Sequence, residues 1–361
     1  MSAVSAAAAA TTGEVTPAQP PAEPKASVSQ PVSAPDGKAE TDPQPGWQGG
    51  SVEVLIGLLL LVVALQATIN KSVSAPVLQN WTTVFIAVVT QALPFLILGV
   101  MLSASLVVFV PPGFFARALP NNPVLAVPVA GMAGVILPGC ECASVPVAGA
   151  LVRRGVTPAA ALAFLLAAPA VNPVVLVATA VAFPRNPEMV FARFGASLLV
   201  ACVMGWLWLR LGRSDWLRQP PRPSFDGKSK GEAFWGSVRH DVMHAGGFLV
   251  LGAMAAATFK AVVPAAWLHT VASMPVVSIL ALSVLAVLLS ICSEADAFVA
   301  ASLSQFSLTA RLAFLVVGPM IDLKLFAMQV GTFGRGFAVR FAPVTFVVAI
   351  LGSIVVGAVL L

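Results

Sequence analysis

The chain has 361 residues, of which 58% are hydrophobic and only 10% are charged, and its mean hydropathy is +0.93. A soluble domain carries about 25% charged residues, so this composition excludes an ordinary soluble protein and indicates an all-α, polytopic membrane protein. The net charge of +5 is concentrated in one loop rather than on a basic face with interleaved aromatic residues, which argues against nucleic-acid binding.

The chain begins with a segment that is unlike the rest. Residues 1–50 are rich in Ala, Pro, Ser and Thr, and such a composition buries too little apolar surface to offset the entropy of ordering. We therefore expect a disordered tail at 1–50. The apolar stretch at 51–70 predicts one transmembrane helix that is peripheral to the function.

Eight further apolar stretches are each long enough for a membrane-crossing helix, which takes about 20 residues. They lie at 83–110, 124–153, 158–183, 190–212, 243–265, 274–303, 310–333 and 341–361. Together with the segment at 51–70, they predict about eight to ten transmembrane helices in a multi-pass protein of the cell (inner or plasma) membrane.

A sequence pattern occurs twice, at an offset of about 150 residues. The matching positions are 95–101 with 248–254 (Phe-Leu-x-Leu-Gly-x-Met), Cys140 with Cys292, and Pro169 with Pro319. We therefore expect two permease repeats, at 80–212 and 242–361, that are either parallel or inverted. The linker at 213–241 is basic, and the positive-inside rule predicts that it is cytoplasmic.

The segment at 124–153 is interrupted near its middle. Pro138 and Gly139 predict a helix stop, and Ser144 with Pro146 predicts a new helix start. The backbone around Cys140-Glu141-Cys142 is therefore expected to be unwound. The next segment is interrupted in the same way at Pro169-Ala-Val-Asn172-Pro173, where Asn172 is expected to cap a second half-helix.

The second copy keeps both breaks with different chemistry. Cys292-Ser-Glu294-Ala-Asp296 corresponds to the Cys-Glu-Cys break, and Pro319-Met-Ile-Asp322-Leu-Lys324 corresponds to the Asn172 break. Irregular backbone in lipid is tolerated only where it is buried in protein or lines a cavity. A single proline often only kinks a helix, but four matching breaks predict the broken or re-entrant helices of a transporter.

Charged residues inside apolar helices are expensive, at about 2.5–3.5 kcal/mol each, so each needs a partner or a function. We expect the acids in the breaks to contact a cation or a proton during transport. For Asp322 the alternative is a structural ion pair with Lys324. The candidate substrate-binding residues are Cys140, Glu141, Cys142, Asn172, Cys292, Glu294, Asp296 and Asp322.

The Cys-Glu-Cys break has three interpretations. Cys140, Cys142 and Cys292 form a site for a thiophilic atom such as Zn²⁺, Cu⁺ or trivalent arsenic if the two halves face each other. Alternatively, Cys140 and Cys142 form a redox-active disulfide, or they are small residues that allow helices to approach closely.

The motifs around these breaks resemble those of a known family over about residues 80–350. The motifs are Pro-Gly-Cys140-Glu-Cys142-Ala-Ser-Val-Pro146, Ala-Ala-Pro169-Ala-Val-Asn172-Pro173, Cys292-Ser-Glu-Ala-Asp296 and Gly318-Pro-Met-Ile-Asp322-Leu-Lys324. They are similar to the predicted permease family that includes the ArsP-type organoarsenical exporters. The resemblance implies a multi-span permease and, as in those exporters, efflux of trivalent organoarsenicals with the cysteines of the first break acting on the substrate.

The central residue of the first break differs from that of the exporters. They tend to have Cys-Ser-Cys, whereas Glu141 stands between the cysteines here, as in a Cys-Glu-Cys branch of the family that is often found beside a second small membrane protein. A carboxylate between two thiols suits a cationic metal at least as well as an organoarsenical.

We therefore expect an integral membrane permease, without enzymatic activity or a cofactor, that moves a small thiophilic or cationic solute: a metal, a metalloid or an organoarsenical. Efflux by alternating access with proton coupling is the expected mechanism. A membrane thiol oxidoreductase and a non-transporting membrane subunit of a complex are the alternatives. The expected partners are the solute and the lipid bilayer, with a second small membrane protein as a further candidate.

Overall fold

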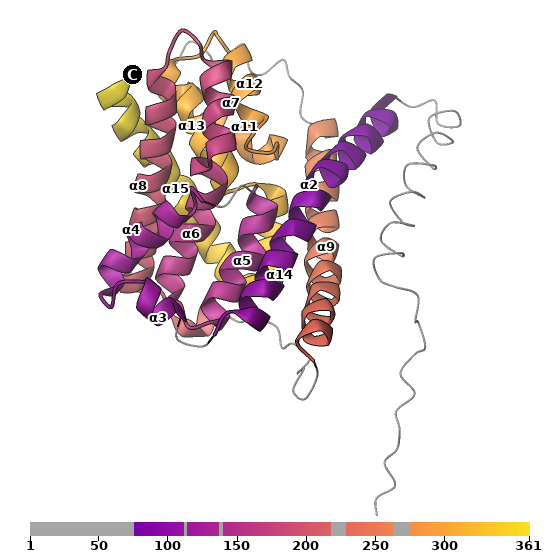
Figure 1. Ribbon diagram of the computed structural model, residues 1–361. Coiled ribbons are helices and arrows are strands. Elements are labelled where there is room, and N and C mark those ends of the chain that lie inside the picture. Colours follow the sequence, from indigo (N-terminus) through magenta and orange to yellow (C-terminus); the bar gives the residue numbers. More distant parts are fainter. Residues whose placement is uncertain (1–75, 112–113, 137–139, 218–228, 263–274) are drawn as a thin grey trace, which may run out of the picture. The chain divides into compact units, whose positions relative to one another are not determined.

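The computed structural model describes residues 76–111, 114–136, 140–217, 229–262 and 275–361. The chain divides into two compact units, 1–48 and 49–361, and all described residues belong to the second unit (Figure 1). The predicted tail at 1–50, the predicted helix at 51–70, Pro138, Gly139 and residues 218–228 of the linker lie outside the described residues.

Every regular element in the described part of the chain is a helix, which confirms the all-α prediction. The first half contains α2 (Pro76–Phe109), α3 (Phe114–Ala118), α4 (Pro123–Ala133), α5 (Glu141–Arg153), α6 (Pro158–Val171), α7 (Pro173–Ala182) and α8 (Glu188–Leu211). After the 3₁₀ helix η1 (Ser214–Trp216) come α9 (Lys230–Val262), α11 (Pro275–Leu289), α12 (Asp296–Ser302), α13 (Leu308–Met320), α14 (Leu323–Phe333) and α15 (Arg335–Leu360).

The two halves contain equivalent elements in the same order. Each begins with a long helix that carries the repeated Phe-Leu-x-Leu-Gly-x-Met pattern, α2 or α9. Two helices separated by a break follow (α4 and α5, or α11 and α12), then a span broken in its middle (α6–α7, or α13–α14), and then a continuous helix (α8, or α15). The internal repeat with broken helices is thus present in the fold.

Six helical segments among the described residues are long and apolar enough to cross a membrane, three in each half. They are Leu78–Phe109, Pro158–Ala182, Glu188–Leu211, Lys230–Thr258, Leu308–Phe333 and Arg335–Leu360. The apolar segments at 124–153 and 274–303 do not form single helices. They fold as pairs of short helices instead, because the backbone is interrupted between α4 and α5 and between α11 and α12.

None of the short helices α4, α5, α11 and α12 is among the segments long enough to cross a membrane alone. Both α4 and α5 pack against α6, the first half of the broken α6–α7 span, and both α11 and α12 pack against α13, the first half of the α13–α14 span. Two consecutive helices beside the same half of a span enter and leave on the same side, so each pair is a re-entrant hairpin. In Figure 1, α4, α5 and α6 lie in the lower part of the bundle, and α11, α12 and α13 lie in the upper part.

The direction of the two halves follows from this topology. Each half has three segments that are long and apolar enough to cross a membrane, in addition to its hairpin. In Figure 1, α2 runs from the upper to the lower part of the bundle and α9 from the lower to the upper part, so the two halves run in opposite directions, as inverted repeats do. In transporters with inverted repeats, binding sites lie near the middle of the membrane, where helices are broken.

The two broken spans form the centre of the bundle. Every residue at 159–171 in α6 is buried, as is every residue at 312–320 in α13. The outer helices α2 and α15 expose apolar side chains over much of their surface, as expected of helices that face lipid. The small side chains of α6, which is rich in alanine, allow its neighbours to approach closely.

Candidate functional site

Each broken span is interrupted just before a capped half-helix. Asn172 caps α7, with its Oδ1 accepting a hydrogen bond from the Val175 N–H at 2.9 Å, which confirms the predicted cap. Asp322 caps α14 in the same way, accepting from the Leu325 N–H at 2.6 Å. A carboxylate at this position is also stabilised by the positive end of the helix dipole.

The Asn172→Ala substitution is expected to destabilise the break in the first half by about 1 kcal/mol, because the Val175 N–H loses its acceptor. Thermal unfolding in detergent measures this loss. Asn172→Asp keeps an acceptor at the cap and is expected to retain most of the stability. Equal losses in the two variants would contradict a capping role.

The prolines of the breaks lie mostly inside helices. Pro146 lies within α5, and Pro169 and Pro319 lie near the C-terminal ends of α6 and α13. The expected helix start at Ser144 is therefore wrong, and so is the expected unwound backbone at Glu141 and Cys142, which lie in the first turn of α5. The helix α5 begins at Glu141, because the carbonyl of Cys140 already accepts hydrogen bonds from the N–H groups of the residues three and four positions later.

Pro173 is the first residue of α7. A proline is well accommodated there, since the N–H that it lacks would have no partner within the helix. Asn172 and Pro173 together thus define the restart of the helix beyond the break.

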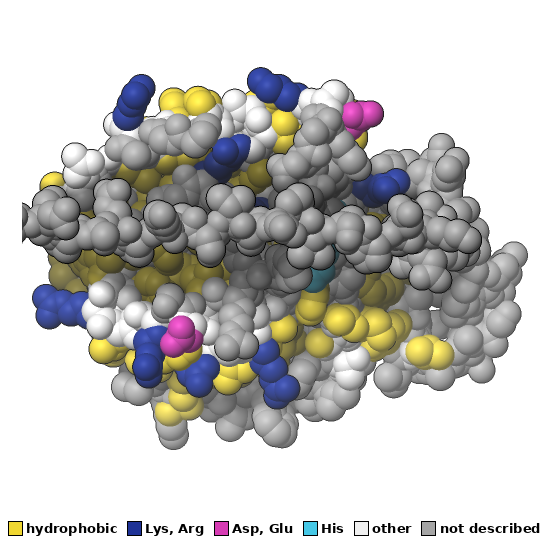
Figure 2. Space-filling model, turned by 90° about the horizontal axis from the view of Figure 1, so that it is seen from below, with side chains coloured by type: hydrophobic (Ala, Val, Ile, Leu, Met, Phe, Trp, Pro, Cys, Tyr) yellow, Lys and Arg dark blue, Asp and Glu magenta, His cyan; other side chains and the backbone are white. Residues whose placement is uncertain are grey.

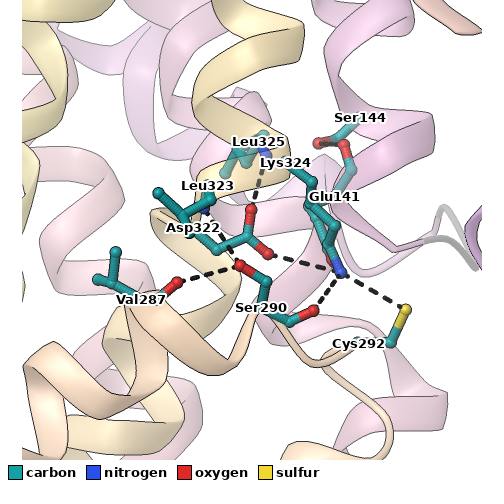
Figure 3. A network of polar contacts seen from close by, with 9 residues as sticks. All are labelled: Glu141, Ser144, Val287, Ser290, Cys292, Asp322, Leu323, Lys324 and Leu325. Carbon is teal, nitrogen blue, oxygen red and sulfur yellow. Dashed lines mark hydrogen bonds and ion pairs between the residues drawn. The ribbon is translucent and has the colours of Figure 1, made fainter. Parts of the chain in front are cut away.

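Lys324 lies at the centre of a buried polar cluster formed with Glu141, Ser290, Cys292 and Asp322, here called the Lys324 cluster (Figure 3). Its Nζ lies 2.6 Å from Glu141 Oε1 and 3.5 Å from Asp322 Oδ2. The same ammonium donates to the Ser290 carbonyl at 3.1 Å and contacts Cys292 Sγ at 3.8 Å. The cluster therefore joins the start of α5, the start of α14 and the segment between α11 and α12.

Three thiols meet beside this cluster. The thiols of Cys140, Cys142 and Cys292 lie close enough to interact with one another, and all three cysteines are buried and free of disulfides. The structure thus brings together the cysteines that the sequence analysis considered as one site. No group of three or more His, Cys, Asp or Glu side chains in the described segments is arranged to hold a metal ion, and the Lys324 ammonium lies among the acceptors.

Ser290 ends α11 in an unusual conformation. It has a φ of 47° and is the one non-glycine residue with positive φ in the part of the chain that the structure describes. Its Oγ donates to the Val287 carbonyl at 3.0 Å and accepts from the Leu323 N–H at 3.3 Å. Such backbone strain costs about 1–3 kcal/mol and persists where surrounding contacts require it; here it directs the Ser290 carbonyl toward Lys324.

A second buried ion pair joins the two halves. Arg193 of α8 lies 2.8 Å from Asp296 Oδ2 at the start of α12, and the same guanidinium donates to the Ser293 carbonyl at 3.1 Å and to Thr179 Oγ1 of α7 at 2.8 Å. All four residues, here called the Arg193 cluster, are buried. Arg193 was not among the residues predicted from the sequence. An arginine one turn inside the apolar Glu188–Leu211 span, away from the Arg210 end, is the signal that points to it.

Several acceptors around the breaks have no donor. Glu141 Oε2, Ser293 Oγ and Asp296 Oδ1 are buried without a hydrogen-bond partner among the described residues. Glu294 is half-buried and interacts electrostatically with Glu141 and with the cations of both clusters. A buried polar atom without a partner costs about 1–3 kcal/mol, and more if charged. The breaks therefore carry more carboxylates than buried cations, and the Arg193 Nε donor also lacks a partner within the described part of the chain.

Two glycines of the repeated pattern support the site. A Cβ on Gly252 of α9 would lie 2.4 Å from the Cα of Lys324, and one on Gly99 of α2 would lie 2.4 Å from the Cα of Ala143. Glycine thus lets α9 approach the start of α14, and α2 approach the start of α5. The repeated sequence therefore positions the two half-helices that carry Lys324 and Glu141.

Comparison with known proteins agrees with this architecture. Residues 77–358 match the ArsP_1 family, which is described as "predicted permease". The chain belongs to this permease family. It is therefore a multi-pass membrane permease, with the family and the apolar helices pointing to the same conclusion.

Two relatives match most of the chain. The UPF0718 protein YcgR of Bacillus subtilis (strain 168) is 35% identical over 281 residues, which is 76% of this chain and 96% of that protein. A Streptococcus mutans (serotype c, strain ATCC 700610 / UA159) protein, described as a candidate subunit of a two-component membrane permease complex, is 30% identical over 282 residues, or 76% of this chain and 94% of that one. No solved structure matches the chain significantly.

Proposed function

We propose that this permease moves a small thiophilic cation through the site formed by the three thiols and the Lys324 cluster. The observation that carries this proposal is the meeting of Cys140 and Cys142 from one half with Cys292 from the other, beside the buried carboxylates of Glu141 and Asp322. Sulfur ligands select soft metals and metalloids such as Zn²⁺, Cu⁺ and trivalent arsenic.

The surrounding charge favours a cationic cargo over an anionic one. The carboxylates of the breaks outnumber the buried cations of the two clusters, and Glu141 Oε2 and Asp296 Oδ1 lack donors among the described residues. A positive cargo satisfies such acceptors, whereas an anion adds to the excess of negative charge. An organoarsenical remains within this class if it binds as a thiophilic cation.

The distribution of basic residues supports an orientation for the permease. Arg117, Arg213, Lys230 and Arg335 are exposed at the ends of helices on one side of the bundle, and Lys and Arg side chains are spread over this face in Figure 2. The connection between α7 and α8, on the other side, carries Arg185. By the positive-inside rule, the basic side and the linker at 213–241 are cytoplasmic.

Alternating access with outward transport is the mechanism that we propose for this orientation. Inverted halves exchange inward-facing and outward-facing arrangements around a fixed central site, and the broken spans supply that site here. The resemblance to ArsP-type exporters supports efflux, and the membrane-embedded carboxylates are groups of the kind that exchange protons in coupled transporters. The description of the Streptococcus mutans relative as a complex subunit supports a second membrane protein as a partner.

Transport into everted membrane vesicles tests the site. With radioactive Zn²⁺ or trivalent arsenic as the probe, Cys140→Ser is expected to lower the initial rate at least about tenfold, as loss of a metal-site contact typically does. Cys202→Ser is the matched control, because Cys202 is a buried thiol in α8 outside the site. An unchanged rate in Cys140→Ser would disprove the site, and no flux with the wild-type chain would favour a non-transporting subunit.

A further inference from the structure

Lys324 occupies the position among the acceptors where a cationic cargo would bind. Its ammonium contacts two carboxylates, one carbonyl and one thiol, from Glu141, Asp322, Ser290 and Cys292. These are the oxygen and sulfur atoms that bind a metal cation in proteins. The side chain of Lys324 is 1% exposed, so the ammonium takes all of these contacts from within the bundle.

We propose that Lys324 is a tethered cation that competes with the cargo for the same acceptors, so that cargo binds only by displacing its ammonium. This inference rests on the proposed function. Two cations within about 4 Å repel each other strongly in a weakly polar interior. The ammonium and the cargo therefore occupy the acceptors in turn, not together.

The backbone of Lys324 is held in place, so only its side chain moves when the ammonium is displaced. Its Cα packs so closely against Gly252 of α9 that a Cβ on residue 252 would not fit. Asp322 caps the same helix turn through the Leu325 N–H. The side chain itself is a flexible four-carbon stem with a compact charge at its end. Rotation of the stem releases the acceptors while α14 stays in its position against α9.

Competition with Lys324 makes the site selective for soft cations. The ammonium is close to the oxygen atoms, at 2.6 Å from Glu141 Oε1, but only loosely contacts Cys292 Sγ at 3.8 Å. Alkali cations bind oxygen and gain little from sulfur, so they have no advantage over the ammonium at these acceptors. A thiophilic cation additionally gains bonds to the sulfur atoms as the thiols release their protons to solvent, whereas the ammonium makes only the loose contact with Cys292 Sγ.

A purely structural lysine leads to a different expectation. If Lys324 only neutralises Glu141 and Asp322, its removal loosens the site and weakens cargo binding. If Lys324 competes with the cargo, its removal strengthens cargo binding, because the acceptors no longer have a tethered partner. The sign of the change in affinity therefore separates the two roles.

Cadmium binding to the purified full-length protein measures this sign. Cd²⁺ is the probe, and its thiolate absorption in the ultraviolet reports binding at the cysteines. Lys324→Met is expected to bind Cd²⁺ at least about tenfold more tightly than the wild type, since about 1.4 kcal/mol of competition corresponds to tenfold. Lys324→Arg keeps the charge and is expected to stay within about threefold of the wild type.

Two further variants control for loss of folding and for a general effect of charge. Lys324→Met/Glu141→Gln removes one charge of each sign and is expected to bind Cd²⁺ more tightly than Glu141→Gln alone. Lys260→Met removes a cation of α9 that interacts with Lys324 only through its charge, and it is expected to leave the affinity nearly unchanged.

Different outcomes test the competition by Lys324 and the proposed cargo site separately. Equal or weaker Cd²⁺ binding after removal of Lys324, in either background, overturns the competition while the cargo site stands. An equal gain in Lys260→Met overturns it as well, because the effect would then be general electrostatics. Absence of Cd²⁺ binding in the wild type and in all variants overturns both proposals.

Discussion

Replacing Arg193 with methionine is expected to lower the free energy of unfolding by about 3–5 kcal/mol, the cost of leaving a buried charge without its partner. Asp296 loses its ion pair at 2.8 Å, and the Ser293 carbonyl and Thr179 Oγ1 lose their donors. Because the pair joins α8 of one half to α12 of the other, transport is expected to fall as well. Thermal unfolding in detergent measures the loss of stability.

A double-mutant cycle shows whether the loss comes from the ion pair itself. Asp296→Asn in the Arg193→Met background is expected to recover a substantial part of the stability, since no unpaired carboxylate remains. Arg185→Met is the matched control, because Arg185 lies exposed in the loop before α8, and it is expected to have no effect. Strictly additive losses at Arg193 and Asp296 would show that the pair does not stabilise the fold.

Gly252→Ala is the second substitution with a large expected effect. The new Cβ would lie 2.4 Å from the Cα of Lys324, which belongs to the backbone and does not rotate away. Overpacking of this kind costs about 1–3 kcal/mol, and sometimes more. Since α9 and α14 must separate, the Lys324 ammonium moves relative to Glu141, and vesicle transport is expected to fall together with the melting temperature.

The same helix provides the control for this prediction. Gly247 of α9 is exposed, and a Cβ there meets no other atom within 4 Å. Gly247→Ala is expected to be neutral or slightly stabilising, since alanine favours helix by up to about 1 kcal/mol over glycine. Similar losses in the two variants would show that close helix approach at Gly252 is not the cause.

The features that the sequence predicts well are local or repeated. Asn172 followed by Pro173 is a cap and a helix start within two adjacent residues, and the structure has both. The matching positions of Cys140 and Cys292 predict that they lie at equivalent points of the two halves, and the fold places their thiols close enough to interact. In both cases the information lies in neighbouring residues or in the comparison of two copies.

The features that the sequence does not reveal depend on tertiary packing. Arg193 and Asp296 are 103 positions apart, and an arginine near the start of a span resembles an interfacial residue. The left-handed Ser290 is held by Val287 and Leu323 rather than by its own propensity. The segment at 124–153 is long enough to cross the membrane, and only the packing of α4 and α5 on α6 shows that it turns back.

The two inverted halves have different side chains at equivalent positions, and this difference affects the relative free energies of the forms that the permease can adopt. Exchange of two identical inverted halves would interconvert forms of equal free energy, and the permease would rest equally on either side of the membrane. Here Cys142 and Glu141 belong to one half and Asp322 and Lys324 to the other. In the proposed alternating access, the two forms would therefore differ in free energy, and this difference would give the permease a preferred resting side before any gradient acts on it.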